Sequence, residues 1–255
     1  MDDLKKYIDM YKKFMVLETF PNVCVEYYNE YDLLNAVAVV NNDDILNDIF
    51  VLRCHEDINN YLDRYITATV FHEFTHILDG LVFRQMDYDI FLNLMSTYSE
   101  FHSSRIEFMY LYGCKNIYDK KQIKVNKYIE SEKDLVTVST YVLQPLSLLI
   151  DDLNKTKKDY DNLTEDEFIG NYIRIEKNIM FMLGYLSVIE NSKNENKNLV
   201  NLCFSECRNY KSDIKRIYEI LNSKNDYLRH PEMLLDSVFS LRRKFAEEFS
   251  DKYSF

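Results

Sequence analysis

The sequence predicts an α+β fold that is predominantly α-helical, with a small β-sheet near the N-terminus and a helical bundle in the C-terminal part. The chain of 255 residues holds only four Gly and three Pro, too few for the many turns of an all-β sandwich or barrel. Three short apolar or β-branched runs follow Pro21, whereas nearly everything after about Asp57 has the apolar spacing of helices. A content of 47% hydrophobic and 29% charged residues is that of a globular protein with a sizeable core.

The first part of the chain is expected to hold one helix and a small sheet. Residues 1–15, MDDLKKYIDMYKKFM, alternate charged and apolar side chains as an amphipathic helix does. They start acidic and lack the basic region and apolar core of a signal peptide. Pro21 ends this pattern, and polar connectors separate the next three runs, which predict strands that pair in part antiparallel: 22–28, 35–41 and 49–54.

Long helices are expected over most of the remaining chain. Their predicted bounds are 57–80, 90–112, 126–153, 164–191, 199–222 and 231–252. Pro145 should kink or divide the third of these, because proline lacks the backbone N–H that the helix needs. A capping box of Thr164 and Glu167 should start the fourth, and residues 191–198 should form a polar loop.

Two arrangements of these elements are open. Residues 1–115 can form a core that carries the chemistry, with residues 116–255 as a helical extension packed on that core. The whole chain can instead form one continuous domain, since no repeat and no linker-like segment divides it.

Charge and cysteine content exclude several classes of partner and compartment. The net charge is −11, and no basic run is long enough to hold a phosphate backbone, so we expect no nucleic-acid partner. The most apolar stretch, 135–150, carries Ser, Thr, Gln and Pro and is too short to span a bilayer, so no membrane association is expected. Five scattered cysteines predict reduced thiols and a cytoplasmic protein, and Cys203 and Cys207 are expected to be packing residues.

The most informative segment is His72-Glu73-Phe74-Thr75-His76, an HExxH motif. Two histidines four residues apart on a helix lie one turn apart on the same face, so both imidazoles can reach one tetrahedral zinc. Glu73 then lies beside the metal, where it can act as general base on a zinc-bound water. With only five His in the chain, about 0.007 such motifs are expected by chance.

The helix around this motif has one polar and one apolar face. At about 100° per residue, His72, His76 and Asp79 share a face, and the apolar residues Val70, Phe74, Ile77, Leu78 and Leu81 lie opposite. We expect the apolar face to be packed and the polar face to open to a cleft. Asp79 can accept the second ring N–H of one imidazole, or it can simply be the polar end of the helix before Gly80.

A catalytic zinc needs a third protein ligand, for which the next helix offers three candidates. Glu100 is favoured, because small polar residues flank it on its own helix face and allow a close approach to another helix. Glu107 is the main alternative. It can instead accept a hydrogen bond from the ring N–H of a ligand histidine that does not face the metal. His102 falls on the apolar side of this helix if the helix is regular, so it should not share a site with Glu100.

These residues resemble a known group of enzymes. HEFTH followed by Glu100, 24 residues after His76, resembles the gluzincin branch of the zincin metallopeptidases. The strands before the motif and the pattern Glu100-x-x-Ser103-Ser104-x-Ile106 are most similar to the ImmA/IrrE-type metallo-endopeptidases. The resemblance covers roughly residues 22–112, which is most of the predicted zincin-like core at 1–115. The sequence departs from the family where Glu107 replaces a small residue and where an apolar-Pro helix ending is absent.

The resemblance implies a zinc endopeptidase with one Zn²⁺ per chain. In that family the two histidines and the later glutamate bind zinc, which implies these roles for His72, His76 and Glu100, with Glu73 as the catalytic base. It also implies a protein or peptide substrate inside the cell, such as a transcriptional regulator. The alternative is a non-catalytic protein with a zincin scaffold whose C-terminal helices bind a partner. The complete motif favours the enzyme, because such a scaffold has no need of Glu73.

An oxyanion stabiliser has to come from outside the motif. Tyr227 and His230 are candidates, but His230 precedes Pro231 and can equally be the start of a helix.

Overall fold

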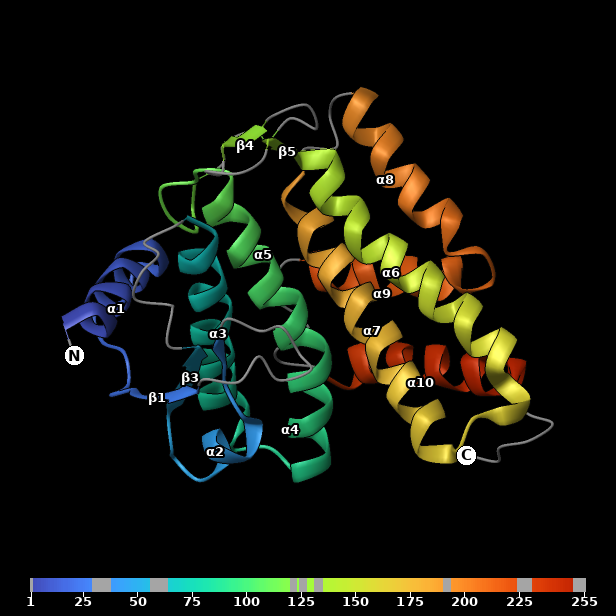
Figure 1. The fold of residues 1–255 in the computed structure, drawn as a ribbon, viewed down its shortest axis with the longest axis horizontal. Coiled ribbons are helices and arrows are strands. Elements are labelled where there is room, and N and C mark those ends of the chain that lie inside the picture. The colour runs from blue at the N-terminus through green and yellow to red at the C-terminus, as the bar shows by residue number, and fades with distance from the viewer. Residues whose placement is uncertain are drawn as a thin grey trace. The chain divides into compact units, whose positions relative to one another are not determined.

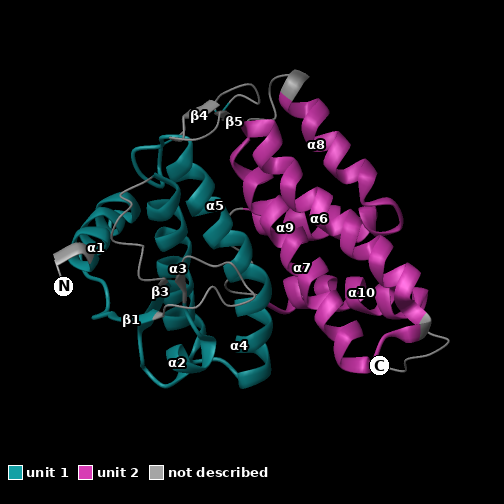
Figure 2. Ribbon diagram, viewed as in Figure 1, with its two compact units in different colours: residues 1–123, 128–136 teal, residues 124–127, 137–255 magenta. Residues whose placement is uncertain are grey.

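The computed structural model describes residues 2–28, 38–55, 64–119, 123, 128–130, 135–189, 194–223 and 231–249. Contacts divide the chain into two compact units (Figure 2). Unit 1 contains residues 1–123 and 128–136, and unit 2 contains residues 124–127 and 137–255. The fold is predominantly helical with a small sheet, as the sequence predicts. A division of function between 1–115 and 116–255 stays a prediction.

Unit 1 combines a three-stranded sheet with helices (Figure 1). Its elements are α1 (Asp2–Met15), β1 (Cys24–Tyr28), β2 (Ala38–Val39), α2 (Asn42–Leu46), β3 (Val51–His55), α3 (Arg64–Phe83), α4 (Tyr88–Leu94), the π-helical turn η2 (Met95–Ser99), α5 (Glu100–Leu111), β4 (Tyr128–Glu130) and β5 (Leu135–Thr137), of which Thr137 itself belongs to unit 2. The strand order is β1-β3-β2, with β1 parallel and β2 antiparallel to β3. The expected mixture of pairings in this sheet is confirmed.

The N-terminal helix packs on α3 through aromatic side chains. Tyr11 is fully buried, and its ring meets those of Phe71 and Phe74 edge to face at 5.1 and 5.4 Å. Its hydroxyl lies 2.9 Å from Thr75 Oγ1, which satisfies the one polar atom that this packing buries. The predicted amphipathic helix is confirmed, and it supports the back of the motif helix.

Unit 2 consists of helices. They are α6 (Val138–Asp159), the 3₁₀ turn η3 (Tyr160–Asn162), α7 (Glu165–Val188), α8 (Asn194–Glu206), the 3₁₀ turn η4 (Arg208–Tyr210), α9 (Lys211–Asn222) and α10 (Pro231–Glu248). α6 packs along α7, and α9 packs against α10. The predicted capping box is present, because Thr164 Oγ1 accepts the Glu167 N–H and the Glu167 carboxylate accepts the Thr164 N–H.

The predicted helix 126–153 is wrong in its first part. β4 and β5 form a two-stranded sheet there, and α6 starts only at Val138, where Thr137 Oγ1 accepts the Thr140 N–H at 3.1 Å. Tyr and Ile begin β4, and Val and Thr end β5, and these residue types favour strands. Pro145 does not divide α6, because it costs one backbone hydrogen bond while its ring is buried in the packed face.

Four further helix bounds differ from the predicted ones. α8 already begins at Asn194, so the predicted loop 191–198 is wrong from there on, and Asn196 in its first turn is buried. The predicted helix 199–222 is two helices, separated by η4, where Arg208 has a φ of 45°. α3 continues past Gly80 to Phe83, whereas α10 ends at Glu248. The expected start of α3, 57–63, lies outside the described residues.

The structure also shows the state of the cysteines and the lengths of the apolar helices. All five cysteines are free thiols, and Cys203 and Cys207 are buried on or beside α8. Within the described ranges, no helix combines the length and the apolarity needed to cross a bilayer.

Candidate metal centre

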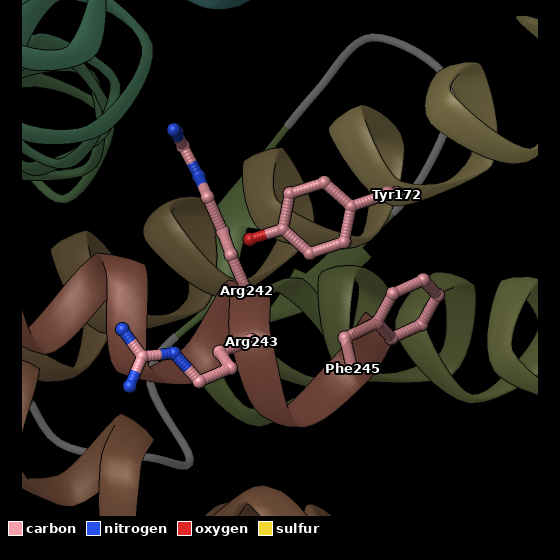
Figure 3. Close-up of a pocket in the computed structure, with 4 residues that line it drawn as sticks. All are labelled: Tyr172, Arg242, Arg243 and Phe245. Atoms are coloured by element: carbon pink, nitrogen blue, oxygen red, sulfur yellow. The ribbon is translucent and has the colours of Figure 1, made fainter. Parts of the chain in front are cut away.

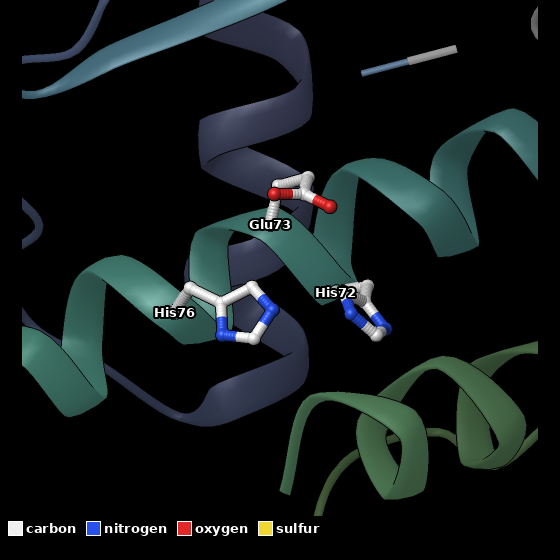
Figure 4. A group of neighbouring side chains, drawn as sticks. All are labelled: His72, Glu73 and His76. Carbon is white, nitrogen blue, oxygen red and sulfur yellow. The ribbon is translucent and has the colours of Figure 1, made fainter. Parts of the chain in front are cut away.

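The HExxH residues lie together in the middle of α3. One ligand atom from each of His72, Glu73 and His76 lies within 4.8 Å of the others. The two imidazoles extend from the same side of the helix, with ring centroids 4.9 Å apart, and the Glu73 carboxylate leaves the helix beside them (Figure 4). This is the arrangement that i, i+4 spacing predicts.

Burial holds α3 in place on both sides. On the apolar side, Val70, Phe74 and Ile77 are fully buried, as predicted. The polar side does not open to a cleft as expected, because His72, Glu73 and His76 are only 5%, 8% and 8% exposed. α5 and η2 pack along α3 and cover this side (Figure 1). The centre is therefore a nearly buried polar cluster between helices.

Glu100 and Glu107 contact opposite nitrogens of His72. Glu100 Oε2 lies 3.5 Å from His72 Nε2 and 3.7 Å from His76 Nε2. Glu107 Oε2 lies 3.1 Å from His72 Nδ1, on the other side of the ring. The two histidines therefore present their Nε2 atoms to the same oxygen of Glu100, whereas Glu107 holds His72 from behind.

The charges around His72 favour its protonated form. Burial acts to lower the pKa of its imidazole, but hydrogen bonds with Glu100 and Glu107 and the nearby charge of Glu73 outweigh it and raise that pKa to about 10. Ser103 Oγ lies 3.1 Å from Nε2 and donates its own hydrogen to the Glu100 carbonyl, so it accepts from Nε2. A metal binds only neutral histidine, and its binding must release this proton.

Asp79 contacts His76 through a serine and not directly, which corrects the sequence expectation. Ser99 Oγ lies 2.8 Å from His76 Nδ1 and donates to Asp79 Oδ2 at 2.9 Å. The imidazole that Asp79 does contact is that of His102, whose Nδ1 lies 2.9 Å from Oδ1. Asp79 is 5% exposed and lies within α3, so it is not merely the polar end of that helix.

His102 belongs to this cluster, although the sequence placed it on the apolar side of its helix. Its ring does lie against Tyr98, with centroids 5.5 Å apart, but Nδ1 turns towards Asp79. Ser99 was not among the expected site residues, and Ser103 was expected only as a small residue beside Glu100, whereas it contacts His72. One signal was present, because Ser99 and His102 are three residues apart and so share a helix face. The π turn that contains Ser99 has no clear sequence signature and could not be predicted.

A backbone group also orients Glu73. The N–H of Val40, the residue after β2, donates to Glu73 Oε2 at 2.8 Å. The sheet and the motif helix are thereby joined at the predicted base.

The donor atoms fit a zinc ion. Two imidazole nitrogens and one carboxylate oxygen, with an open fourth position, are the ligands of many catalytic zinc sites. His72, His76 and Glu100 would supply them. The predicted oxyanion candidates Tyr227 and His230 lie outside the described residues.

Unit 2 holds a separate cavity of about 310 Å³ (Figure 3). Its lining includes Tyr172, Phe245 and the side chains of Arg242 and Arg243. Arg242 also donates to the buried Glu176 carboxylate at 2.8 and 2.9 Å, which makes this ion pair part of the α7–α10 packing.

No protein-family model, curated protein or solved structure matches this chain.

Proposed function

We propose that this chain is a zinc-dependent endopeptidase in which His72, His76 and Glu100 hold one Zn²⁺ and Glu73 is the general base. The observation that carries the proposal is the convergence of both Nε2 atoms on one Glu100 oxygen, at 3.5 and 3.7 Å. Once binding of a metal displaces the proton from His72 Nε2, two nitrogen lone pairs and a carboxylate oxygen would face one another, which favours a cation between them. The resemblance of HEFTH and Glu100 to the gluzincins supports the same assignment.

Zinc in such a site lowers the pKa of water to about 7 and polarises a carbonyl group. The protein's own part is proton transfer. The Glu73 carboxylate, held by the Val40 N–H, accepts a proton from the attacking water and returns it to the nitrogen of the amine that leaves. Glu107 holds His72 by Nδ1, which directs Nε2 of that ring towards Glu100.

The sheet supports an extended peptide as the substrate class. Among the described strands, β2 is at one edge of the sheet, and Val40 follows it directly. An extended peptide can bind to such an edge through main-chain hydrogen bonds. The contact between Val40 and Glu73 places this edge next to the proposed base. A cytoplasmic regulatory protein as the substrate is part of the same proposal and depends on the resemblance alone.

The proposal is tested first by metal content. Elemental analysis of the purified chain should find about one zinc per chain, and His76→Ala should lose it. Glu73→Gln should keep zinc but lose cleavage of a mixture of unstructured peptides, followed by mass spectrometry. Glu219→Gln makes the same change at an exposed residue of α9 and should keep both properties.

These measurements test the metal site, the role of Glu73 and catalysis separately. A wild-type chain without zinc, or unchanged zinc in His76→Ala, overturns the metal site. Cleavage that persists in Glu73→Gln removes Glu73 from the mechanism. Full zinc content without cleavage of any peptide favours the non-catalytic scaffold whose C-terminal helices bind a partner.

A further inference from the structure

Hydrogen bonds connect four polar side chains in a row. They are His102 of α5, Asp79 of α3, Ser99 of η2 and His76 of α3. His102 Nδ1 contacts Asp79 at 2.9 and 3.2 Å, Ser99 Oγ donates to Asp79 at 2.9 Å, and Ser99 Oγ lies 2.8 Å from His76 Nδ1. Ser99 is fully buried and Asp79 is 5% exposed, so water has little access to these bonds. A buried polar chain of this kind is costly unless its members are satisfied by one another.

The hydrogens in this chain can be assigned one by one. A carboxylate only accepts hydrogen bonds, and a hydroxyl has a single hydrogen to donate. Ser99 gives that hydrogen to Asp79 Oδ2, so at its contact with His76 the serine oxygen must accept. His76 therefore carries hydrogen on Nδ1. In the neutral ring its lone pair is then on Nε2, the atom that lies 3.7 Å from Glu100.

We propose that Ser99 and His102 are positioning residues for the metal ligand His76. Ser99 fixes the tautomer of His76, and His102 holds the Asp79 carboxylate that orients the Ser99 hydroxyl. This inference rests on the proposed zinc site. It assigns a task to the two polar residues of α5 and η2 that face Asp79, whereas Glu107 performs the corresponding task for His72 directly.

The position of His102 makes its contribution specific to one nitrogen. Nδ1, not Nε2, contacts Asp79. The side-chain nitrogen of Asn is as many bonds from the backbone as Nδ1, whereas the nitrogen of Gln corresponds to Nε2. His102→Asn can therefore keep a donor to Asp79, and His102→Gln cannot keep it at the same place. The two variants are matched in chemistry and differ in donor position.

The test measures metal binding and not peptide cleavage. Zn²⁺ affinity is determined by competition with a chelating dye, and the visible absorption of the Co²⁺-loaded protein reports ligand geometry. Ser99→Ala should weaken Zn²⁺ binding about 10- to 100-fold and change the Co²⁺ spectrum. His102→Gln should weaken binding about tenfold, and His102→Asn should restore it to within about twofold of wild type.

A purely structural role predicts a different pattern. The free energy of unfolding of each chelator-treated variant would then fall while Zn²⁺ affinity stayed at the wild-type value, and that result overturns the inference. Equal affinities of His102→Asn and His102→Gln also overturn the role of His102. If the wild-type chain binds no Zn²⁺, the proposed function fails. If wild type binds Zn²⁺ and His76→Ala does not, but Ser99→Ala binds like wild type, only the present inference fails.

Discussion

His72 lies between two carboxylates that act on different nitrogens of one ring. Glu100 is on the Nε2 side, which it shares with His76, and Glu107 is on the Nδ1 side. A metal bound to both Nε2 atoms would have Glu100 within its reach, whereas Glu107 would act on it through His72. The two glutamates of α5 should therefore differ in what their loss does to zinc.

We predict that Glu100→Ala abolishes stoichiometric zinc binding. Glu107→Ala should keep about one zinc per chain at saturating metal, with affinity lowered by about 10- to 100-fold, because only the orientation of His72 is lost. Elemental analysis and dye competition on both variants measure this difference. The opposite pattern would transfer the ligand role from Glu100 to Glu107.

We also predict that Cys24 is the one rapidly reacting thiol of the native chain. Burial raises the pKa of Cys54, Cys203 and Cys207 to about 12, with a smaller contribution from the charge of Glu73 in the case of Cys54. Cys114 is buried, whereas Cys24 is exposed on β1. A disulfide reagent at pH 8 should label one thiol quickly and all five after denaturation. A fast-reacting thiol that remains in Cys24→Ser would contradict this.

Single residues were predictable from the sequence where local periodicity decides their position. Four-residue spacing puts His72 and His76 on one face, and α5 is regular from Glu100 to Glu107. Ser99 and His102 were not, because their contacts are with Asp79 on another helix. Periodicity within one helix reports which residues share a face and leaves open which partner that face meets.

At the scale of elements, α2 packs closely against α3 at Gly80. A Cβ atom added at Gly80 would lie 2.4 Å from Cγ2 of Ile45, which is fully buried. The side chain at this position has to be absent for α2 to pack on the motif helix. Gly170 on α7 is the opposite case, because a Cβ atom there would meet nothing within 4 Å.

We predict opposite effects for the same substitution at these two glycines. Gly80→Ala should lower the free energy of unfolding, since overpacking costs about 1–3 kcal/mol and the gain in helix propensity is about 1 kcal/mol. Gly170→Ala should raise it by up to about 1 kcal/mol. Urea unfolding followed by circular dichroism measures both. A Gly80→Ala chain as stable as wild type would show that Ile45 can move away at little cost.

Element type was predicted well where the apolar pattern is long and poorly where short segments pair. The apolar spacing of α7 and its capping box indicate both the helix and its start. β4 and β5 pair with each other over three residues each, which a pattern of apolar spacing cannot reveal. The same holds for α8, whose polar first turn is helical and has Asn196 buried.

At the scale of the whole molecule, the described ligands of the proposed zinc site lie in unit 1. The hydrogen bonds and ion pairs given above join residues of α3 to Val40, η2 and α5. A ligand that binds only the folded state stabilises it by about 2.7 kcal/mol at a free concentration one hundred times its Kd. That stabilisation should act on the unit that provides the ligands.

We therefore predict that zinc protects unit 1 from amide hydrogen exchange. Amides of α3 and α5 should exchange more slowly in the presence of Zn²⁺, while those of α7 should change little. His76→Ala is the control and should show no zinc effect in either unit. Equal protection of α3 and α7 would show that both units open in one cooperative step.

The π turn at Met95–Ser99 also affects how relatives of this chain can be found. Such a turn takes up one residue more than an α-helix needs, while the helices on either side keep their faces. In a protein with a regular helix here, the same glutamate would face the same histidines from one position earlier than Glu100, which comes 24 positions after His76. A search pattern for this site should therefore leave the length of that interval variable by one residue.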